Sequence, residues 1–170
     1  MSGSDVAAHE VRGRDLGSGL AQLIIGVGNR FRGDDAAGPL VGEALAARGF
    51  EVEEHAGEGA SLMELWRGRS HVVLIDATRS GAAPGTIIRF DAALQSVPTG
   101  IFHYSTHEFS VAEAIETARL LDWLPNSLRV FGIEGAAWDY GAPVSAPVAA
   151  AVERLANEIA DLLAADTGPR

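Results

Sequence analysis

Three short runs of mainly apolar residues dominate the hydrophobic pattern of the chain. They read LIIGV, HVVLID and LRVFGI and lie at residues 23–27, 71–76 and 128–133. Runs without polar alternation are typical of strands buried on both faces, as in the middle of a parallel sheet. Two further strands are predicted at Phe50–Glu54 and Gly85–Phe90, and the acids of the first indicate a position near a sheet edge.

Helical patterns separate these strands. Three segments carry apolar residues at helical spacing, and a fourth, short segment begins with Ser61 and Glu64 at the spacing of a capping box. The helices are predicted at Pro39–Ala47, Leu62–Trp66, Ser110–Leu121 and Val148–Leu163.

The alternation of strands and helices predicts an α/β fold, a three-layer α/β/α sandwich with a doubly wound, mostly parallel five-stranded sheet. The segment from Ile75 to Phe90 is too short for a helical crossover, so the strand at Gly85–Phe90 is expected to run antiparallel to its predecessor. A length of 170 residues suits one domain. We expect this domain at residues 19–165, after a disordered tail of small and polar residues at 1–18.

Composition excludes several classes of partner and site. The formal net charge of −10 argues against nucleic acid and anionic membranes as partners. The chain has no cysteine, which rules out disulfides and thiolate metal sites. No apolar run suits a signal peptide or approaches the ~18 residues of a membrane span, so a cytoplasmic protein is expected.

The first buried strand leads into a glycine-broken loop with two adjacent acids. Gly26 and Gly28 are expected to let the backbone leave the strand. Asp34 and Asp35 follow at the carboxyl end of the strand, where open α/β sheets bind their ligands.

Two more polar residues are expected at the same carboxyl edge of the predicted sheet. Asp76 ends the second buried strand and His107 immediately precedes a helix, so both should reach the same sheet edge as Asp35. Two carboxylates and one imidazole from three loops form a ligand set for a divalent transition metal. This set suits zinc or nickel better than calcium, which prefers oxygen ligands only.

Each candidate also has a purely structural interpretation. The two aspartates could cap the following helix, Asp76 could turn the chain, and His107 could simply start a helix. Either of the two adjacent acids, Asp34 or Asp35, could supply the first carboxylate ligand. No role is assigned to the remaining histidines, His9, His55, His71 and His103.

Three common motifs are absent. The third glycine of a dinucleotide-binding G-x-G-x-x-G is replaced by Phe31, and the two acids would repel a pyrophosphate at the helix start. His107 and Glu108 resemble the start of a zinc-protease HExxH, but Val111 stands in the place of the second histidine. No G-x-S-x-G occurs, so a serine nucleophile has no support.

Taken together, these motifs resemble those of the hydrogenase maturation endopeptidases. Gly26-Val27-Gly28-Asn29 with Asp34-Asp35 and Gly38 is similar to the opening motif of that family. Asp76 after HVVLI and the segment Ser105-Thr106-His107 match its second and third signature regions. The GIEG run at Gly132–Gly135 and the terminal helix fit its end, so the resemblance covers roughly residues 22–163.

The resemblance implies an endopeptidase that removes the C-terminal extension of a NiFe-hydrogenase large-subunit precursor after nickel insertion. The nickel-contacting and catalytic residues of the family would fall on Asp35, Asp76 and His107. The neighbouring Asp34 is then expected to cap or orient the loop. The nickel would belong to the substrate, so we expect no permanently bound cofactor and a monomer whose partner is the precursor. The metal could polarise the scissile carbonyl, or a carboxylate could act as general base on water.

Two alternatives remain open from the sequence. The same residues would serve a non-catalytic nickel-dependent chaperone of the large subunit, and the fold would also suit a peptidase with another protein substrate, as in the germination proteases. In the loop Gly135–Pro147, Trp138 and Tyr140 would either dock the substrate or cover the edge of the sheet.

Overall fold

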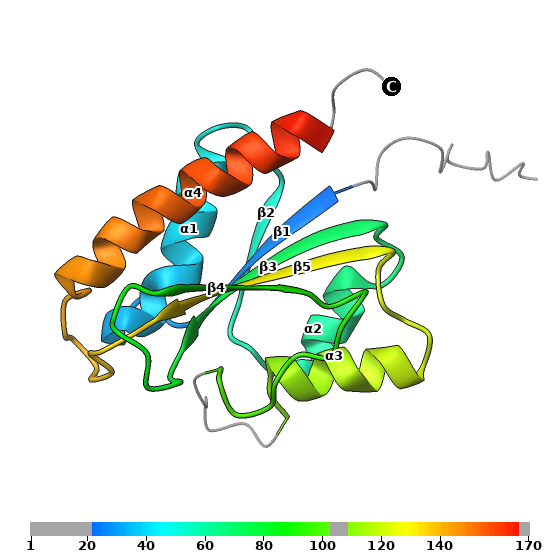
Figure 1. The fold of residues 1–170 in the computed structure, drawn as a ribbon, viewed down its shortest axis with the longest axis horizontal. Coiled ribbons are helices and arrows are strands. Elements are labelled where there is room, and N and C mark those ends of the chain that lie inside the picture. Colours follow the sequence, from blue (N-terminus) through cyan, green and yellow to red (C-terminus); the bar gives the residue numbers. More distant parts are fainter. Residues whose placement is uncertain (1–21, 103–108, 167–170) are drawn as a thin grey trace, which may run out of the picture.

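The computed structural model describes residues 22–102 and 109–166 as a five-stranded sheet with helices on both faces (Figure 1). Parallel pairing joins β2 to β1, β1 to β3 and β3 to β5, and β4 pairs antiparallel with β5 at one edge, which gives the order β2-β1-β3-β5-β4. The strands are β1 (Gln22–Val27), β2 (Val52–His55), β3 (His71–Thr78), β4 (Ile87–Asp91) and β5 (Ser127–Glu134). The helices are the 3₁₀ turn η1 (Gly33–Ala36), α1 (Ala37–Ala46), α2 (Gly59–Trp66), α3 (Val111–Leu120) and α4 (Ala146–Asp166).

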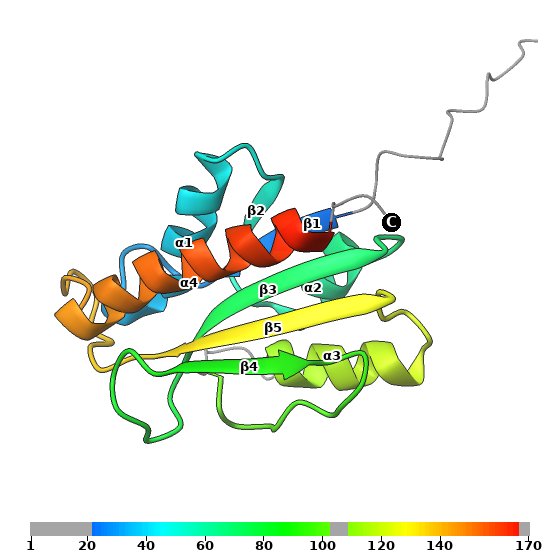
Figure 2. The same ribbon diagram turned by 45° about the horizontal axis from the view of Figure 1, so that its top comes forward.

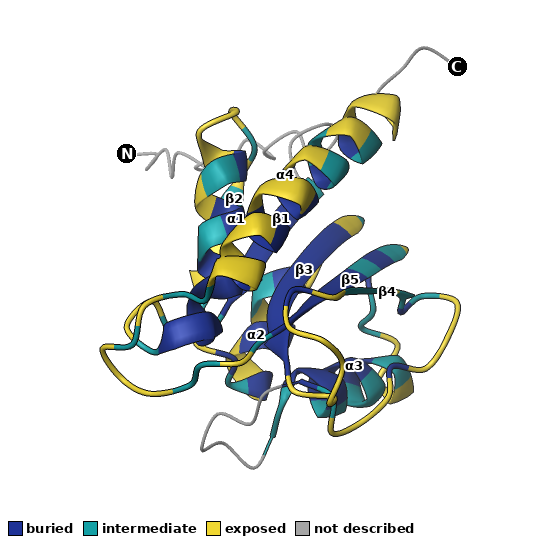
Figure 3. Ribbon diagram, turned by 60° about the vertical axis from the view of Figure 1, so that its left-hand side comes forward, coloured by how far each residue is buried: buried dark blue, intermediate teal, exposed yellow. Residues whose placement is uncertain are grey.

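The predicted fold class is confirmed: α1 and α4 cover one face of the sheet, and α2 and α3 cover the other (Figure 2). The central strands β1 and β3 are buried along nearly their whole length (Figure 3). Within the described ranges, no helix is long and apolar enough to cross a membrane.

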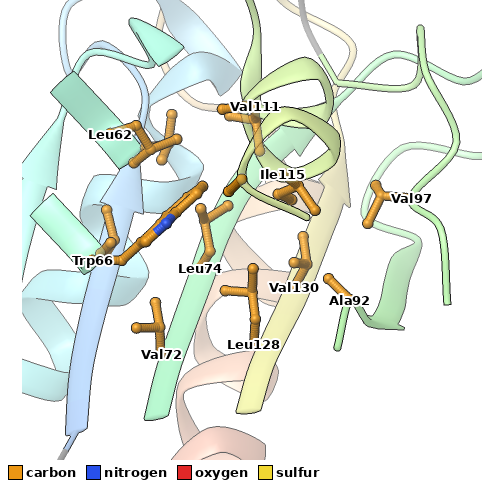
Figure 4. Packing of buried hydrophobic residues seen from close by; sticks show 14 of the residues in the cluster. Leu62, Trp66, Val72, Leu74, Ala92, Val97, Val111, Ile115, Leu128 and Val130 are labelled. Atoms are coloured by element: carbon orange, nitrogen blue, oxygen red, sulfur yellow. The ribbon is translucent and has the colours of Figure 1, made fainter. Parts of the chain in front are cut away.

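Each apolar run supplies both layers of the core because successive side chains of a strand point to opposite faces. Leu74 packs with α2 and α3, whereas its neighbours Val73 and Ile75 pack with α1 and α4. Figure 4 shows the first of these layers, where Trp66 of α2 and Ile115 of α3 both lie over the strands, with Leu74 of β3 between them. Each fully buried side chain of this size contributes roughly 1.5–3 kcal/mol, so the apolar runs hold the three layers together.

Two strand predictions need correction. The strand predicted to end at Asp76 continues to Thr78, because β3 and β5 stay paired as far as Thr78 opposite Glu134. Asp76 therefore lies inside β3, opposite Gly132. The strand β4 runs antiparallel to β3 as predicted, but its paired neighbour is β5.

The start of α2 also differs from the prediction. The helix begins at Gly59, and its N-cap is Glu58, whose carboxylate accepts hydrogen bonds of 2.8 Å from the N–H groups of Ala60 and Ser61. Ser61 is thus the third helical residue and not the cap. A glutamate can take this part because its longer side chain folds back onto the first turn.

Gly26, inside β1, and Gly28, just after it, have different roles. Gly28 has a φ of +142°, and its backbone leaves the strand as predicted. Gly26 does not turn the chain: it stays within β1 and pairs with both neighbouring strands. A Cβ on Gly26 would lie 2.6 Å from the carbonyl oxygen of Gly38, so its missing side chain lets α1 approach the sheet closely.

Candidate functional site

Four of the described carboxylates are buried, and all four lie at the carboxyl edge of the sheet: Asp34, Asp35, Asp76 and Glu134. Their exposed fractions are 0%, 8%, 4% and 2%. A buried carboxylate is costly unless hydrogen bonds or a cation compensate for the lost water. Hydrogen bonds compensate Asp34 and Glu134 and lower their pKa values, whereas burial raises the pKa values of Asp35 and Asp76.

Asp34 holds the loop between β5 and α4. Its carboxylate accepts hydrogen bonds from the N–H groups of Ala136 (2.7 Å), Ala137 (2.9 Å) and Ser145 (2.7 Å) and from the Ser145 hydroxyl (2.8 Å). Burial alone would raise the pKa of Asp34, but these donors outweigh it and the pKa is lowered. Asp34 therefore orients a loop, as the sequence led us to expect, and is not free for a ligand.

Glu134 does the same for the loop after β3. Its carboxylate accepts hydrogen bonds from the hydroxyls of Thr78 (2.8 Å) and Ser80 (2.9 Å) and from the N–H groups of Ser80 and Gly81 (3.0 Å). Burial alone would raise the pKa of Glu134, but these donors outweigh it and the pKa is lowered. Sequence reasoning gave Glu134 no role, although an acid at the end of a buried strand was the same signal that singled out Asp76.

Asp35 and Asp76 share a small pocket at the ends of β1 and β3. Its walls are Val27, Gly28, Asp35, Ala56, Gly57, Asp76, Ser110 and Val111. The Asp76 carboxylate accepts a 2.8 Å hydrogen bond from the N–H of its own neighbour, Ala77. The two carboxylates predicted to converge from separate strands therefore do line one pocket.

Both carboxyls of this pocket resist ionisation. Burial and then the negative charge of Asp35 raise the pKa of Asp76 well above its ordinary value of 3.8. Burial also raises the pKa of Asp35, against the charge of Arg32 and the N–H of Asn29. A divalent cation would replace the protons and relieve the repulsion between the two charges. Carboxylate oxygens can hold such a cation, and in this pocket burial outweighs the hydrogen bonds and the charge of Arg32 that favour ionisation.

The third predicted residue, His107, lies in the segment 103–108, outside the described residues. The described residues contain no group of three or more His, Cys, Asp or Glu side chains that could hold a metal. The assignment of His107 to this site stays a prediction.

His55, to which the sequence analysis assigned no role, holds the part of the pocket wall formed by Ala56 and Gly57. Its Nδ1 accepts a 3.0 Å hydrogen bond from the Gly57 N–H, and its Nε2 lies 3.0 Å from the Ser61 hydroxyl. The His55 carbonyl accepts a further bond, from Gly28 at 3.0 Å. Burial lowers the pKa of His55, against the opposing charge of Glu58. His55 thus fixes the backbone of Ala56 and Gly57 along the pocket.

The aromatic residues of the loop after β5 have two different environments. Trp138 is half-buried against the core layer of α1 and α4, and its ring lies so close to Gly135 that a Cβ there would be 2.6 Å from it. Tyr140 is 72% exposed. Trp138 therefore covers the sheet edge, whereas Tyr140 stays available to a partner.

We expect Trp138→Ala to lower the free energy of unfolding by about 2 kcal/mol, because it leaves a cavity over the sheet edge. Tyr140→Ala, on the same loop, is the matched control and should change stability by less than about 0.5 kcal/mol. Urea unfolding of the two variants measures both values. Equal losses of unfolding free energy in the two variants would show that the Trp138 ring does not stabilise the core.

We expect Asp34→Asn to lower the free energy of unfolding by about 2 kcal/mol at pH 7, because an amide cannot accept all four hydrogen bonds. The lowered pKa sets the sign of the pH dependence: the contribution of Asp34 is complete above the ordinary pKa of 3.8 and is lost as the pH falls through the lower, folded-state pKa. Wild type and variant should therefore converge in acid. The exposed Asp139→Asn in the same loop is the control for urea unfolding at pH 7 and pH 3, and a loss that stays constant with pH would contradict the role of the charge.

Comparisons with known proteins agree with this architecture. A family model described as HycI, hydrogenase maturation protease, matches residues 43–162, a range that includes Asp76 and begins after Asp35. A curated relative, Protein FrxA from Pyrococcus furiosus, is 36% identical over 58 residues, which are 34% of this chain and 42% of FrxA. The match thus spans less than half of that relative.

Two solved structures are similar over most of their length. The hydrogenase maturating endopeptidase HybD from E. coli matches with a TM-score of 0.70 and 23% identity, over 87% of this chain and 94% of HybD. The [NiFe] hydrogenase maturation protease HybD from Thermococcus kodakarensis matches with a TM-score of 0.64 and 27% identity, over 85% and 99%. The chain shares the fold of both.

Proposed function

Because the chain belongs to the hydrogenase maturation protease family, we propose that it removes the C-terminal extension of a NiFe-hydrogenase large-subunit precursor after nickel has been inserted. Asp35, Asp76 and His107 are the residues that we assign to the bound nickel. The metal arrives with the precursor and is part of the substrate, so the enzyme needs no cofactor of its own.

One observation carries the proposal: Asp35 and Asp76 are buried together in one pocket, and the negative charge of Asp35 opposes ionisation of Asp76. A divalent cation makes this arrangement favourable because it takes the place of the protons. A precursor without nickel brings no such cation and leaves the cost of two buried negative charges uncompensated. The pair can thus test whether nickel insertion is complete.

The assigned reaction is hydrolysis of one peptide bond. Water adds to the carbonyl carbon, which becomes the new C-terminal carboxylate of the subunit, and a proton passes to the amine of the released extension. Nickel can polarise the scissile carbonyl, and a carboxylate can accept the proton from water. Both schemes need Asp35 and Asp76 ionised, which is the state that the metal favours.

The position of the pocket supports a protein substrate. It lies at the carboxyl ends of parallel strands, where loops carry the specificity and the strands below stay fixed. Asp34 and Glu134 hold two of these loops through buried hydrogen bonds. Asp35 and Asp76 therefore lie beside loops that these hydrogen bonds hold in place.

Alanine at each assigned position tests the proposal. Mass spectrometry of nickel-loaded precursor should show a shortened subunit with the wild type and an unchanged mass with Asp35→Ala, Asp76→Ala or His107→Ala. Glu53→Ala, at an exposed acid of β2, is the matched control and should process normally. Normal processing by all three alanine variants would refute the assignment. Binding of precursor by the wild type without any change in mass would indicate a chaperone instead.

A further inference from the structure

Two large rings are exposed on two loops that bind each other, and one of these loops leads from β1 to Asp35. Phe31 is 77% exposed and Tyr140 is 72% exposed. The Gly141 N–H donates a 2.8 Å hydrogen bond to the Phe31 carbonyl, which ties the two loops together next to both rings. Aromatic side chains are enriched among the residues that anchor protein interfaces.

The loops that carry these rings are fixed by several further bonds. The Asp34 N–H donates to the Ala137 carbonyl at 2.7 Å, and Arg32 Nε donates to the Trp138 carbonyl at 3.0 Å. The Arg32 guanidinium also lies over the Tyr140 ring, 5.6 Å from its centre. Rings on a rigid base lose little entropy when a partner covers them, which is typical of interface anchors.

The same surface carries two arginines that form no ion pair among the described residues. Among the described residues, six of the ten arginines form ion pairs with carboxylates, and the four that form none are Arg32, Arg48, Arg79 and Arg154. Two of these four, Arg32 and Arg79, lie on this surface. Both contact Trp138, Arg32 through the carbonyl and Arg79 over the ring at 5.9 Å. In a chain of net charge −10, this pair makes a local basic spot that fits a carboxylate.

Arg32 links this surface to the pocket. Arg32 is three residues before Asp35 and lowers the pKa of its carboxyl through its charge. Arg79 follows β3 directly, three residues after Asp76. A protein that presents a metal to Asp35 therefore comes close to Arg32, whose guanidinium lies over the Tyr140 ring.

From this we propose that Phe31, Arg32, Arg79 and Tyr140 form the docking surface for the protein substrate, which binds there through an apolar side chain flanked by a carboxylate. The inference rests on the proposed function for the identity of the partner. The surface supplies affinity and orientation, whereas the pocket supplies the test for nickel.

Processing kinetics with nickel-loaded precursor test this surface. Phe31→Ala with Tyr140→Ala should raise the precursor concentration needed for half-maximal rate about tenfold or more, with the rate at saturation unchanged, because Asp35 and Asp76 are intact. Arg79→Gln should act in the same direction, with an effect that shrinks as salt is added. Leu120→Ala is the control: this side chain is 87% exposed, at the end of α3 away from the pocket. Melting temperatures establish that each variant is folded.

Direct binding of precursor separates this inference from the proposed function. If the wild type processes precursor and the double variant has an unchanged half-maximal concentration, the docking surface is wrong and the proposed function stands. If the wild type binds precursor without cutting it and the double variant binds about tenfold more weakly, the surface stands and the proposed function fails. Absence of binding and cutting would overturn both. A wild-type dimer that the double variant loses would assign the surface to a second copy of the chain and contradict the inference.

Discussion

Asp76→Asn is expected to abolish processing of nickel-loaded precursor while making the protein more stable at neutral pH. The amide can keep the hydrogen bond from the Ala77 N–H, so the backbone around position 76 should not change. It cannot carry the charge that attracts the metal. We expect processing to fall about a hundredfold or more, which corresponds to roughly 2.7 kcal/mol.

The gain in stability follows from the raised pKa of Asp76. A carboxyl whose folded-state pKa lies above its unfolded value destabilises the fold increasingly as the pH rises above the ordinary value of 3.8, because ionisation is easier in the unfolded chain. The amide removes this effect. The variant should therefore melt higher than the wild type at pH 8 and at nearly the same temperature at pH 4.

Thermal unfolding at the two pH values and mass spectrometry of the precursor measure these effects. Glu53→Gln, at an exposed acid of β2, is the matched control and should change neither. A variant that processes at the wild-type rate, or that is less stable at pH 8, would contradict the role given to Asp76.

Gly38→Ala is expected to lower the free energy of unfolding by about 3 kcal/mol or more. Gly38 lies at the start of α1, where a Cβ would overlap the carbonyl oxygens of Val27 and Ile75. Both atoms belong to the backbone of central strands, so neither can move aside. The helix would have to leave the sheet, and η1 with Asp35 would move with it.

Gly42→Ala, one turn later in α1, is the matched control. Its Cβ would meet only the Val52 side chain, at 2.9 Å, and that contact can relax by rotation. Replacing glycine within a helix also adds about 1 kcal/mol of helix propensity. Urea unfolding should show a large loss for Gly38→Ala and a small change for Gly42→Ala, and equal effects would refute the close approach as the cause.

Much of the fold, and the meeting of Asp35 with Asp76 in one pocket, could be predicted from local patterns. The apolar runs identified strands that are buried on both faces, since such a sequence fits only the middle of a layered sheet. The rule that parallel strands end at one edge then brought Asp35 and Asp76 together. The family resemblance, drawn from the same residues, is confirmed by the match of the hydrogenase maturation protease model.

The errors arose where a feature depends on distant parts of the chain. The length of β3 is set by its pairing with β5, so the sequence around Asp76 alone could not place the end of the strand. Glu134 binds donors more than fifty residues earlier in the chain, at Ser80 and Gly81. The surface of Phe31 and Tyr140 exists only because two loops from different strands bind each other.

The central claim is that the buried pair of Asp35 and Asp76 recognises nickel in the precursor. The most direct measurement is mass spectrometry of the same precursor, loaded with nickel or free of it, after incubation with the wild-type protein. The account predicts a shortened subunit only in the loaded sample. Shortening at the same rate in both samples would contradict it.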